Sequence, residues 1–316
     1  MQRRPCAGRL YSTAAAGVQA APYERTGRVR ETRCPVAASP ASNLRRTAMT
    51  DTHVFDEALR LDTLGADARR GRTHPEWANM VGPFGGITAA TLLSAVHAHP
   101  DRIGDPLALT VNYAAPIADG DFDVTLRAAR TNRTNQHWIV ELRQDDVVKT
   151  TATAIFALRR DSWSDTEARP PGTPPPERLP SVDPSLVRWT GRYDMRYVEG
   201  AMPGRGEDPS PSSTSTLWVR DKAGRPVDYP ALAALCDIFY PRVFLRRGGF
   251  VPSGTISLTT YFHADQHELD AVGDDFVLAS AHANRFDRGY FDQSARVWTR
   301  QGGLLANSHQ VVYFKG

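Results

Sequence analysis

A single carboxylate stands inside an apolar stretch in the second half of the chain. Residues 229–240 are almost entirely hydrophobic, and Asp237 is the one charged residue among them. Burying a charge costs free energy unless it has hydrogen-bond partners, so an inward-facing Asp237 must have a reason to be there. A buried carboxylate can serve as a general base. The simpler interpretation is a polar group that is satisfied within the core.

A segment rich in hydroxyl groups follows closely. Residues 254–265 are mostly β-branched and aromatic and come after Pro252, which predicts a strand. Period-two alternation places the polar side chains of this strand on one face: Thr255, Ser257, Thr259 and Tyr261. His263, at the far end of the strand, is a conspicuous candidate base. We interpret it instead as a packed or surface histidine.

Other catalytic signatures are absent from the sequence. No Gly-x-Ser-x-Gly elbow supports a serine hydrolase, and no glycine-rich phosphate loop is found. His137, His282 and His309 lack metal-ligand spacing. Cys236 has no obvious base beside it, and a buried free cysteine is usually inert. The sequence therefore predicts neither a metal nor a redox cofactor.

The elements that must hold these residues begin with a buried helix. A glycine-rich turn at 82–86 leads into residues 87–97, which are small, apolar and almost uncharged. Such a helix is buried nearly all round, and its glycines leave backbone N–H groups free at the positive helix end. Four strands are predicted to follow, at 107–113, 121–128, 136–144 and 147–158. A helix followed by antiparallel strands is an α+β pattern.

The second half repeats the order of the first. Residues 229–240 predict a second buried helix, and strands follow it. Three segments align at an offset of about 150 residues, which is typical of a duplicated unit: residues 109–115 over 258–264, 122–128 over 276–282, and 145–151 over 302–308. We expect two repeats, at 52–160 and 185–316, joined by a proline-rich, semi-rigid linker at 161–184.

Composition narrows the class of protein. The chain has 316 residues, 41% of them hydrophobic and 23% charged, as in a soluble globular protein. No apolar run approaches the length that spans a bilayer. The formal net charge of +3 hides nine arginines and two glutamates in the first 49 residues, so the rest of the chain is mildly acidic. Such a body lacks the basic stripe of a nucleic-acid-binding protein.

The first 48 residues are set apart by their composition. They are rich in Ala, Arg, Ser and Pro and have no periodicity, so we expect disorder there. An organelle transit peptide is one interpretation, and a translation start at Met49 is the other. The remaining chain keeps only Cys236, which indicates a reducing compartment.

The glycine turn, the repeat and the closing strands together resemble a known family. The resemblance covers about residues 52–316 and rests on Gly-Pro-Phe-Gly-Gly at 82–86, the strand from Thr255 to His263, and Gly-Gly-Leu-Leu-Ala-Asn-Ser-His-Gln at 302–310. These segments are similar to those of the acyl-CoA thioesterase II family and its thioesterase-like relatives. The resemblance implies a double hotdog, in which each repeat wraps a long antiparallel sheet around a buried helix.

The resemblance also implies roles for particular residues. Asp237, Thr255 and Gln310 correspond to the Asp, Thr and Gln that hold the attacking water in this family. Gln293 is a rival to Gln310 but matches the family position less well. The N–H groups of Gly85 and Gly86 are candidates for the donors that stabilise the oxyanion.

The function expected from the resemblance is hydrolysis of acyl-CoA thioesters to free acid and coenzyme A. It implies an acyl-CoA substrate, a place in fatty acid metabolism, a cytoplasmic location and a homo-oligomer. Two alternatives remain open. One is a protein that binds acyl thioesters without catalysis. The other is a hotdog enoyl-thioester hydratase or dehydratase, although no Gly-Asp-x-Asn-Pro-type segment is found.

Overall fold

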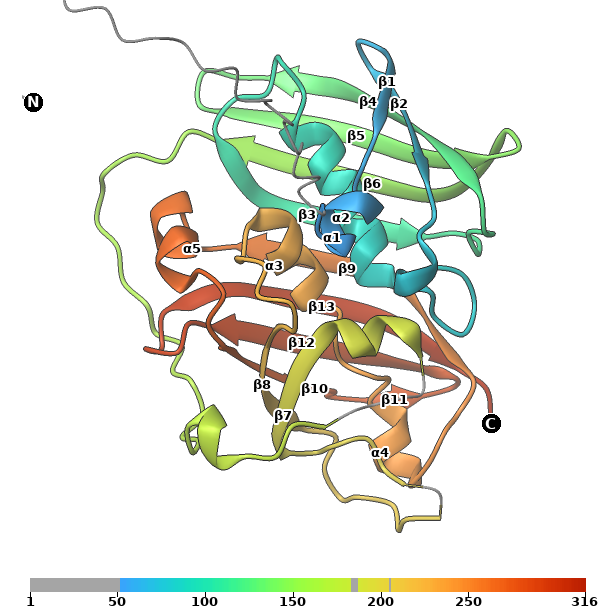
Figure 1. Ribbon diagram of the computed structural model, residues 1–316, viewed down its shortest axis with the longest axis vertical. Coiled ribbons are helices and arrows are strands. Elements are labelled where there is room, and N and C mark those ends of the chain that lie inside the picture. Colours follow the sequence, from blue (N-terminus) through green and yellow to red (C-terminus); the bar gives the residue numbers. More distant parts are fainter. Residues whose placement is uncertain (1–51, 183–186, 205) are drawn as a thin grey trace, which may run out of the picture. The chain divides into compact units, whose positions relative to one another are not determined.

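The fold is built on one continuous antiparallel sheet. The computed structural model describes residues 52–182, 187–204 and 206–316, so the extension predicted at 1–48 lies outside the described residues. Thirteen strands form the sheet, in the order β1-β2-β4-β5-β6-β3-β9-β13-β12-β10-β8-β7, with β11 paired to β12. Figure 1 shows this sheet running from the strands of the first half to those of the second.

The two halves of the sheet use the same plan. In the first half two strands precede a helix and four strands follow it: β1 (Asp62–Gly65), β2 (Ala68–Arg72), α2 (Gly85–His97), β3 (Asp105–Tyr113), β4 (Asp121–Thr131), β5 (Asn135–Gln144) and β6 (Val147–Ala157). The second half repeats this with β7 (Tyr193–Glu199), β8 (Ser215–Asp221), α3 (Tyr229–Leu235), β9 (Ser253–Phe262), β10 (Val277–His282), β12 (Tyr290–Trp298) and β13 (Leu304–Phe314). This is a double hotdog of the α+β class, as predicted.

The remaining elements are short. They are α1 (Val54–Ala58), η1 (Pro75–Trp77), η2 (Pro176–Arg178), η3 (Arg188–Arg192), α4 (Val243–Arg247), α5 (Gln266–Val272) and β11 (Phe286–Asp287). Helix α5 was not predicted from the sequence, although Asp265 and Glu268 form a capping box at its start.

The halves meet where β3 pairs with β9. In this antiparallel seam Thr110 lies opposite Thr259, and their hydroxyl groups are 3.0 Å apart. These two threonines are also equivalent in the repeat alignment of the sequence. Equivalent residues that pair with each other lie at a local pseudo-two-fold axis. A rotation about this axis therefore relates the two repeats across the seam.

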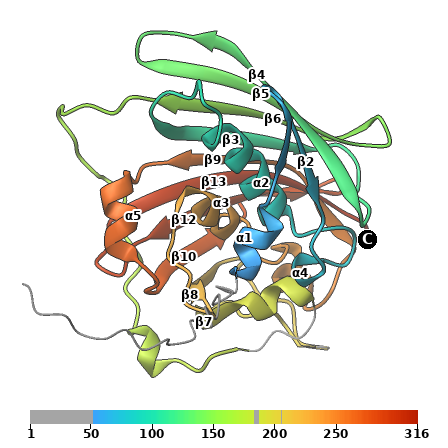
Figure 2. The same cartoon turned by 45° about the horizontal axis from the view of Figure 1, so that its top comes forward.

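Helices α2 and α3 lie side by side against one face of the sheet, which curves around them (Figures 1 and 2). Gly86 makes close packing possible, because a Cβ there would come within 2.8 Å of the Ala234 carbonyl oxygen and closer still to the Phe84 ring. The helices and the inner face of both half-sheets share one hydrophobic core. The core therefore joins the two repeats, in addition to the pairing of β3 with β9.

The proline-rich segment packs on the second half of the sheet rather than spanning open solvent. The Pro174 carbonyl accepts a hydrogen bond of 2.9 Å from the Trp218 indole, and the Pro176 carbonyl accepts one of 3.0 Å from Arg196. Leu179 packs on an outer cluster of Trp218, Phe276, Leu278 and Trp298. Among the described residues, no helix is long and apolar enough to cross a membrane.

Candidate active site

Asp237 lies just beyond the end of helix α3. The sequence predicted that the helix would continue to residue 240, but it ends at Leu235 with Cys236 as its C-cap. The Asp237 N–H still donates to the Ala234 carbonyl, at 3.0 Å. Because the chain leaves the helix here, the Asp237 side chain turns toward the start of α2, where its exposed fraction is 9%.

Gln310 and Thr255 form a directed hydrogen-bond chain to this carboxylate. Gln310 Nε2 donates to Asp237 Oδ1 at 2.8 Å, and the Thr255 hydroxyl donates to Gln310 Oε1 at 3.2 Å. A carboxylate only accepts, so the amide nitrogen of Gln310 must face Asp237. The amide oxygen then faces Thr255, whose hydroxyl has to be the donor. Three residues that are far apart in sequence are thus brought together.

A β-bulge decides which way Thr255 points. Strand β9 pairs with β13 through Ser257 and Val311 and then through Thr255 and Val312, so Ile256 is an extra residue. A bulge of this kind reverses the alternation of faces along a strand. Thr255 therefore points inward to Gln310, whereas Thr259 points outward to Thr110. The predicted single polar face is therefore wrong at Thr255, whereas Ser257, Thr259 and Tyr261 do share one face.

The glycines at the start of α2 lie against the carboxylate. Phe84, the N-cap of this helix, offers no side-chain hydrogen bond, and the Gly86 N–H faces the Asp237 carboxylate closely enough to lower its pKa. A Cβ on Gly85 would lie only 2.6 Å from Asp237 Oδ2. Asp237 thus completes the N-terminus of α2 from the other repeat, which suits a negative charge at the positive end of a helix.

The protonation of Asp237 is strongly perturbed. Burial raises the pKa of its carboxyl to about 7, and the hydrogen bonds from Gln310 and Gly86 oppose that rise by favouring the charged form. A carboxyl with a pKa near neutrality exchanges protons readily at physiological pH, as general bases do.

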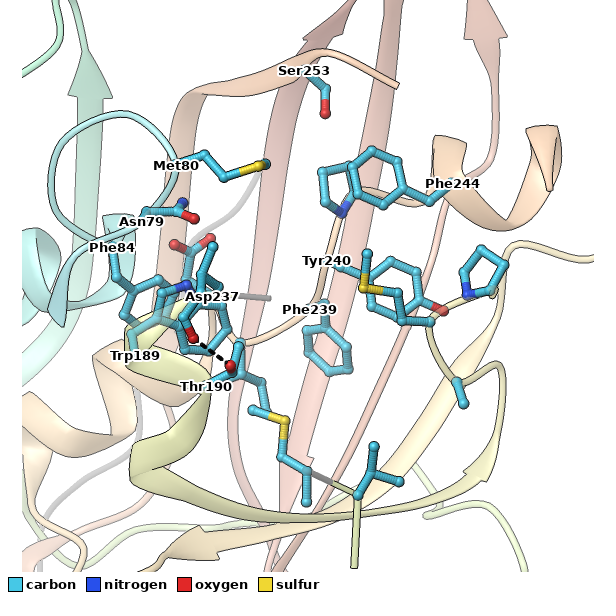
Figure 3. A pocket seen from close by; sticks show the side chains of 18 of the residues that line it. Asn79, Met80, Phe84, Trp189, Thr190, Asp237, Phe239, Tyr240, Phe244 and Ser253 are labelled. Carbon is cyan, nitrogen blue, oxygen red and sulfur yellow. Dashed lines mark hydrogen bonds between the residues drawn. The ribbon is translucent and has the colours of Figure 1, made fainter. Parts of the chain in front are cut away.

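Asp237 and Thr255 open onto a cavity of about 710 Å³. Figure 3 shows Asn79 and Met80 beside the carboxylate, with Trp189 below it and Phe244 across the cavity. The wall is mainly aromatic and methionine side chains: Phe84, Trp189, Met195, Tyr197, Met202, Phe239, Tyr240 and Phe244. Phe84 and Trp189 stack at 4.0 Å between ring centroids. Apolar walls with a few polar groups at one end are typical of small-molecule sites.

A buried arginine that the sequence reading missed supports the segment after Asp237. The Arg242 side chain is 0% exposed. It donates to the Tyr240 carbonyl, to Gln293 Oε1 at 3.1 Å and to the Ser215 hydroxyl at 2.6 Å. Gln293, the rival to Gln310, is therefore engaged by Arg242 instead of Asp237. A signal was present in the sequence, since Arg242 closes the apolar run that begins at residue 229.

The other reactive side chains lie outside this arrangement. His263 Nε2 contacts Asn307 Oδ1 at 2.6 Å in an exposed position. The Cys236 thiol is fully buried, which raises its pKa to about 12. No group of three or more His, Cys, Asp or Glu side chains suited to a metal ion occurs among the described residues.

Comparison with models of known protein families provides an independent line of evidence. Residues 73–157 match the model of the acyl-CoA thioesterase N-terminal domain, and residues 164–314 match that of the C-terminal domain. The chain belongs to the acyl-CoA thioesterase family. The protein is thus a thioester hydrolase. Each match covers one helix-and-strand half of this thioesterase, and the C-terminal match also includes most of the proline-rich segment. Comparison with curated proteins gave no match.

Solved structures similar to this thioesterase share its fold. A hotdog protein of unknown function from Alicyclobacillus acidocaldarius is 45% identical, with a TM-score of 0.80, over 84% of this chain and 99% of that one. A putative thioesterase II from Thermobifida fusca is 20% identical, with a TM-score of 0.73, over 83% and 97% of the two chains. The tesB protein of Mycobacterium avium subs paratuberculosis is 20% identical, with a TM-score of 0.68, over 83% and 98%.

Proposed function

We propose that this thioesterase hydrolyses acyl-CoA by water activated at Asp237, Thr255 and Gln310. The observation that carries the proposal is the chain of hydrogen bonds from Thr255 through Gln310 to Asp237, at the polar end of an apolar cavity. A carboxylate with a pKa of about 7 at that place is able to accept a proton from water.

The geometry supports a particular orientation of the attacking water. The Thr255 hydroxyl donates its hydrogen bond to Gln310, so the Thr255 oxygen remains free to accept a hydrogen bond from water. A water molecule between Asp237 and Thr255 donates one hydrogen to each, and its lone pair then points into the cavity. Gln310 fixes the directions of both neighbours and need not contact the water.

The reaction proceeds by addition and elimination. The water oxygen bonds to the thioester carbon while its proton moves to Asp237, which gives a tetrahedral oxyanion. The C–S bond then breaks, and the proton passes from Asp237 to the departing thiolate, which restores the carboxylate. The Gly86 N–H already faces Asp237. The Gly85 N–H remains the backbone donor that we propose for the oxyanion.

The acyl group is proposed to occupy the aromatic part of the cavity. Pockets of about 300–1,000 Å³ hold most of a small ligand, and the cavity of about 710 Å³ falls within that range. Met195 and Met202 adapt their shape to irregular ligands. We expect a graded series of acyl chains to be accepted until the cavity is filled.

The test is hydrolysis of an acyl-CoA series by the wild type and by Asp237→Asn. The wild type is expected to release free coenzyme A, with kcat/KM falling tenfold per pH unit below about pH 7 as the Asp237 carboxyl becomes protonated. Asp237→Asn, which keeps the shape and loses the base, is expected to lose at least 100-fold in kcat, the lower end of what a general base contributes.

The controls separate this proposal from its rivals. Gln293, on β12, lies directly opposite Gln310 on β13 but bonds Arg242 instead of Asp237. The kcat of a folded Gln293→Ala variant is therefore expected to stay within a few-fold of the wild-type value. Tight binding of acyl-CoA without turnover would indicate a binding protein. Full activity of Asp237→Asn would rule out Asp237 as the base.

A further inference from the structure

One peptide group is held from both ends beside the carboxylate. The Tyr113 hydroxyl donates to the Gly85 carbonyl at 2.8 Å, and the Gly86 N–H faces the Asp237 carboxylate and lowers its pKa. That carbonyl and that N–H belong to the same peptide bond. Tyr113 is the last residue of β3, in the first repeat, whereas Asp237 comes from the second.

Tyr113 and Asp237 also lie on the same side of the Gly85 Cα. A Cβ placed there would be 2.6 Å from Asp237 Oδ2 and 3.3 Å from the Tyr113 hydroxyl oxygen. The phenol is therefore fixed close to the carboxylate, with its only hydrogen committed to the peptide carbonyl. It is not a donor to Asp237 itself.

Hydrogen bonds in such a chain strengthen one another. A donor on a peptide carbonyl draws electron density from the nitrogen of the same peptide, which makes its N–H a better donor. It also fixes the plane of the peptide, and here that plane aims the Gly86 N–H at the carboxylate. Removing the phenol hydroxyl would loosen and weaken the contact to Asp237 without touching Asp237.

We propose that Tyr113 is a positioning residue for Asp237, acting through the Gly85–Gly86 peptide group. The proposal rests on the proposed role of Asp237 as the general base. In this proposal the position of Asp237, in the second repeat, depends on the end of β3 and the start of α2, which both belong to the first repeat. The role of Tyr113 is to hold the carboxylate in its ionised, correctly aimed state and not to exchange a proton.

The titratable groups around Asp237 agree with this role. They are Tyr113 on β3, Cys236 at the end of α3 and Tyr193 on β7. Burial raises the pKa of all three, with the Asp237 charge adding to the effect, so all three stay neutral from pH 5 to 9. Asp237 is thus the one group of this set that titrates in that range.

The test is Tyr113→Phe in the full chain, with Tyr229→Phe as the matched control. Tyr229 also donates its buried hydroxyl to a backbone carbonyl, that of Ala264, at 3.2 Å. Its ring lies beside His97, at the opposite end of α2 from the Gly85–Gly86 peptide. Tyr113→Phe is expected to lower kcat about threefold to tenfold, as for the loss of one hydrogen bond, with KM unchanged. The acid limb of its pH–rate profile is expected to move to higher pH.

A second readout does not need catalysis. The carboxyl stretch of Asp237, assigned by its loss in Asp237→Asn, is followed by infrared titration in wild type and Tyr113→Phe. Its midpoint is expected to rise in Tyr113→Phe and to stay unchanged in Tyr229→Phe. If the wild type fails to hydrolyse acyl-CoA, the proposed function is wrong while this titration still tests the contact.

Two results would overturn the inference. One is an unchanged Asp237 midpoint in Tyr113→Phe. The other is an equal fall in kcat and an equal shift in Tyr229→Phe, which would mean that any buried tyrosine–carbonyl hydrogen bond has the same effect through general packing.

Discussion

Burying the Asp237 carboxylate costs free energy, and its hydrogen bonds offset part of that cost. Its carboxylate lies in the core and receives Gln310 Nε2 and the Gly86 N–H, yet the pKa still rises to about 7. The folded state therefore holds the proton more tightly than the unfolded chain does. The stability that this group contributes is complete below its ordinary pKa and is lost as the pH rises through about 7.

The first prediction at the residue scale concerns stability. Asp237→Asn stays neutral at every pH, so it is expected to gain stability relative to the wild type as the pH rises from 5 to 8. The gain is roughly 3 kcal/mol, from 1.36 kcal/mol per pKa unit. Urea denaturation at the two pH values measures it. A difference between the variants that is independent of pH would contradict the raised pKa.

The second prediction concerns Gly85. The backbone there is helical, so alanine is locally tolerated, but its Cβ would lie 2.6 Å from Asp237 Oδ2 and displace the carboxylate. Gly85→Ala is expected to keep its melting temperature within a few degrees and to lose roughly 100-fold in kcat, as for small misplacements of catalytic groups.

The adjacent glycine provides the contrast. Gly86→Ala would press on the Phe84 ring and on the Ala234 carbonyl between the two helices. It is therefore expected to lower the melting temperature measurably, because the backbone of α3 has to move. If the two variants behaved alike, Gly85 would have no separate role at the carboxylate.

At the scale of elements, the bulge in β9 turns Thr255 toward Gln310 at the proposed site. Without the extra residue Ile256, Thr255 would share a face with Ser257 and Thr259 and point away from Gln310. The early end of α3 has the same kind of effect, because it frees Asp237 from the helix. Both irregularities lie next to the cavity, where bulges often re-aim a side chain.

The prediction at this scale compares two threonines of the same strand. Thr255→Val removes the donor to Gln310 Oε1 and is expected to lower kcat about tenfold, the scale of one buried hydrogen bond. Thr259→Val makes the same chemical change on the outer face, at the seam with Thr110, and is expected to leave kcat unchanged. Equal effects in both variants would contradict the inward orientation of Thr255.

At the scale of the whole molecule, the site belongs to neither repeat alone. Gly86 and Tyr113 come from the first half, and Asp237, Thr255 and Gln310 from the second. One core and one sheet hold the halves together. The proline-rich segment then packs on the outer face of the second half through Pro174, Pro176 and Leu179.

The prediction at this scale concerns the proline-rich segment that packs on the second half of the sheet. Replacing residues 170–179 by a Gly/Ser segment of equal length would uncover the cluster of Trp218, Phe276, Leu278 and Trp298. The variant is expected to bind a dye specific for exposed apolar surface and to melt at least 5 °C lower, because apolar area returns to water. Activity per folded molecule is expected to remain, since the segment contacts the face opposite the cavity. An unchanged melting temperature would show that the segment adds no stability.

Much of the fold could be predicted from sequence patterns that depend only on neighbouring residues. Two apolar, small-residue helices followed by alternating strands, at a repeated offset, were enough to predict two wrapped sheets. Asp237 stood out because a lone charge in an apolar run is costly. The glycines at 85 and 86 stood out because they leave backbone N–H groups free at the start of a helix.

The tertiary structure decided what these residues do to one another. Period-two reasoning could not find the bulge at Ile256, because pairing with β13 across the sheet imposes it. Nor could a helical pattern show that α3 ends before Asp237, or that Arg242 holds Gln293. The peptide between Gly85 and Gly86 meets Tyr113 and Asp237 only after both repeats have folded together. Hydrogen-bond direction and close contact depend on tenths of an ångström between distant segments, whereas sequence periodicity records only which side of an element is buried.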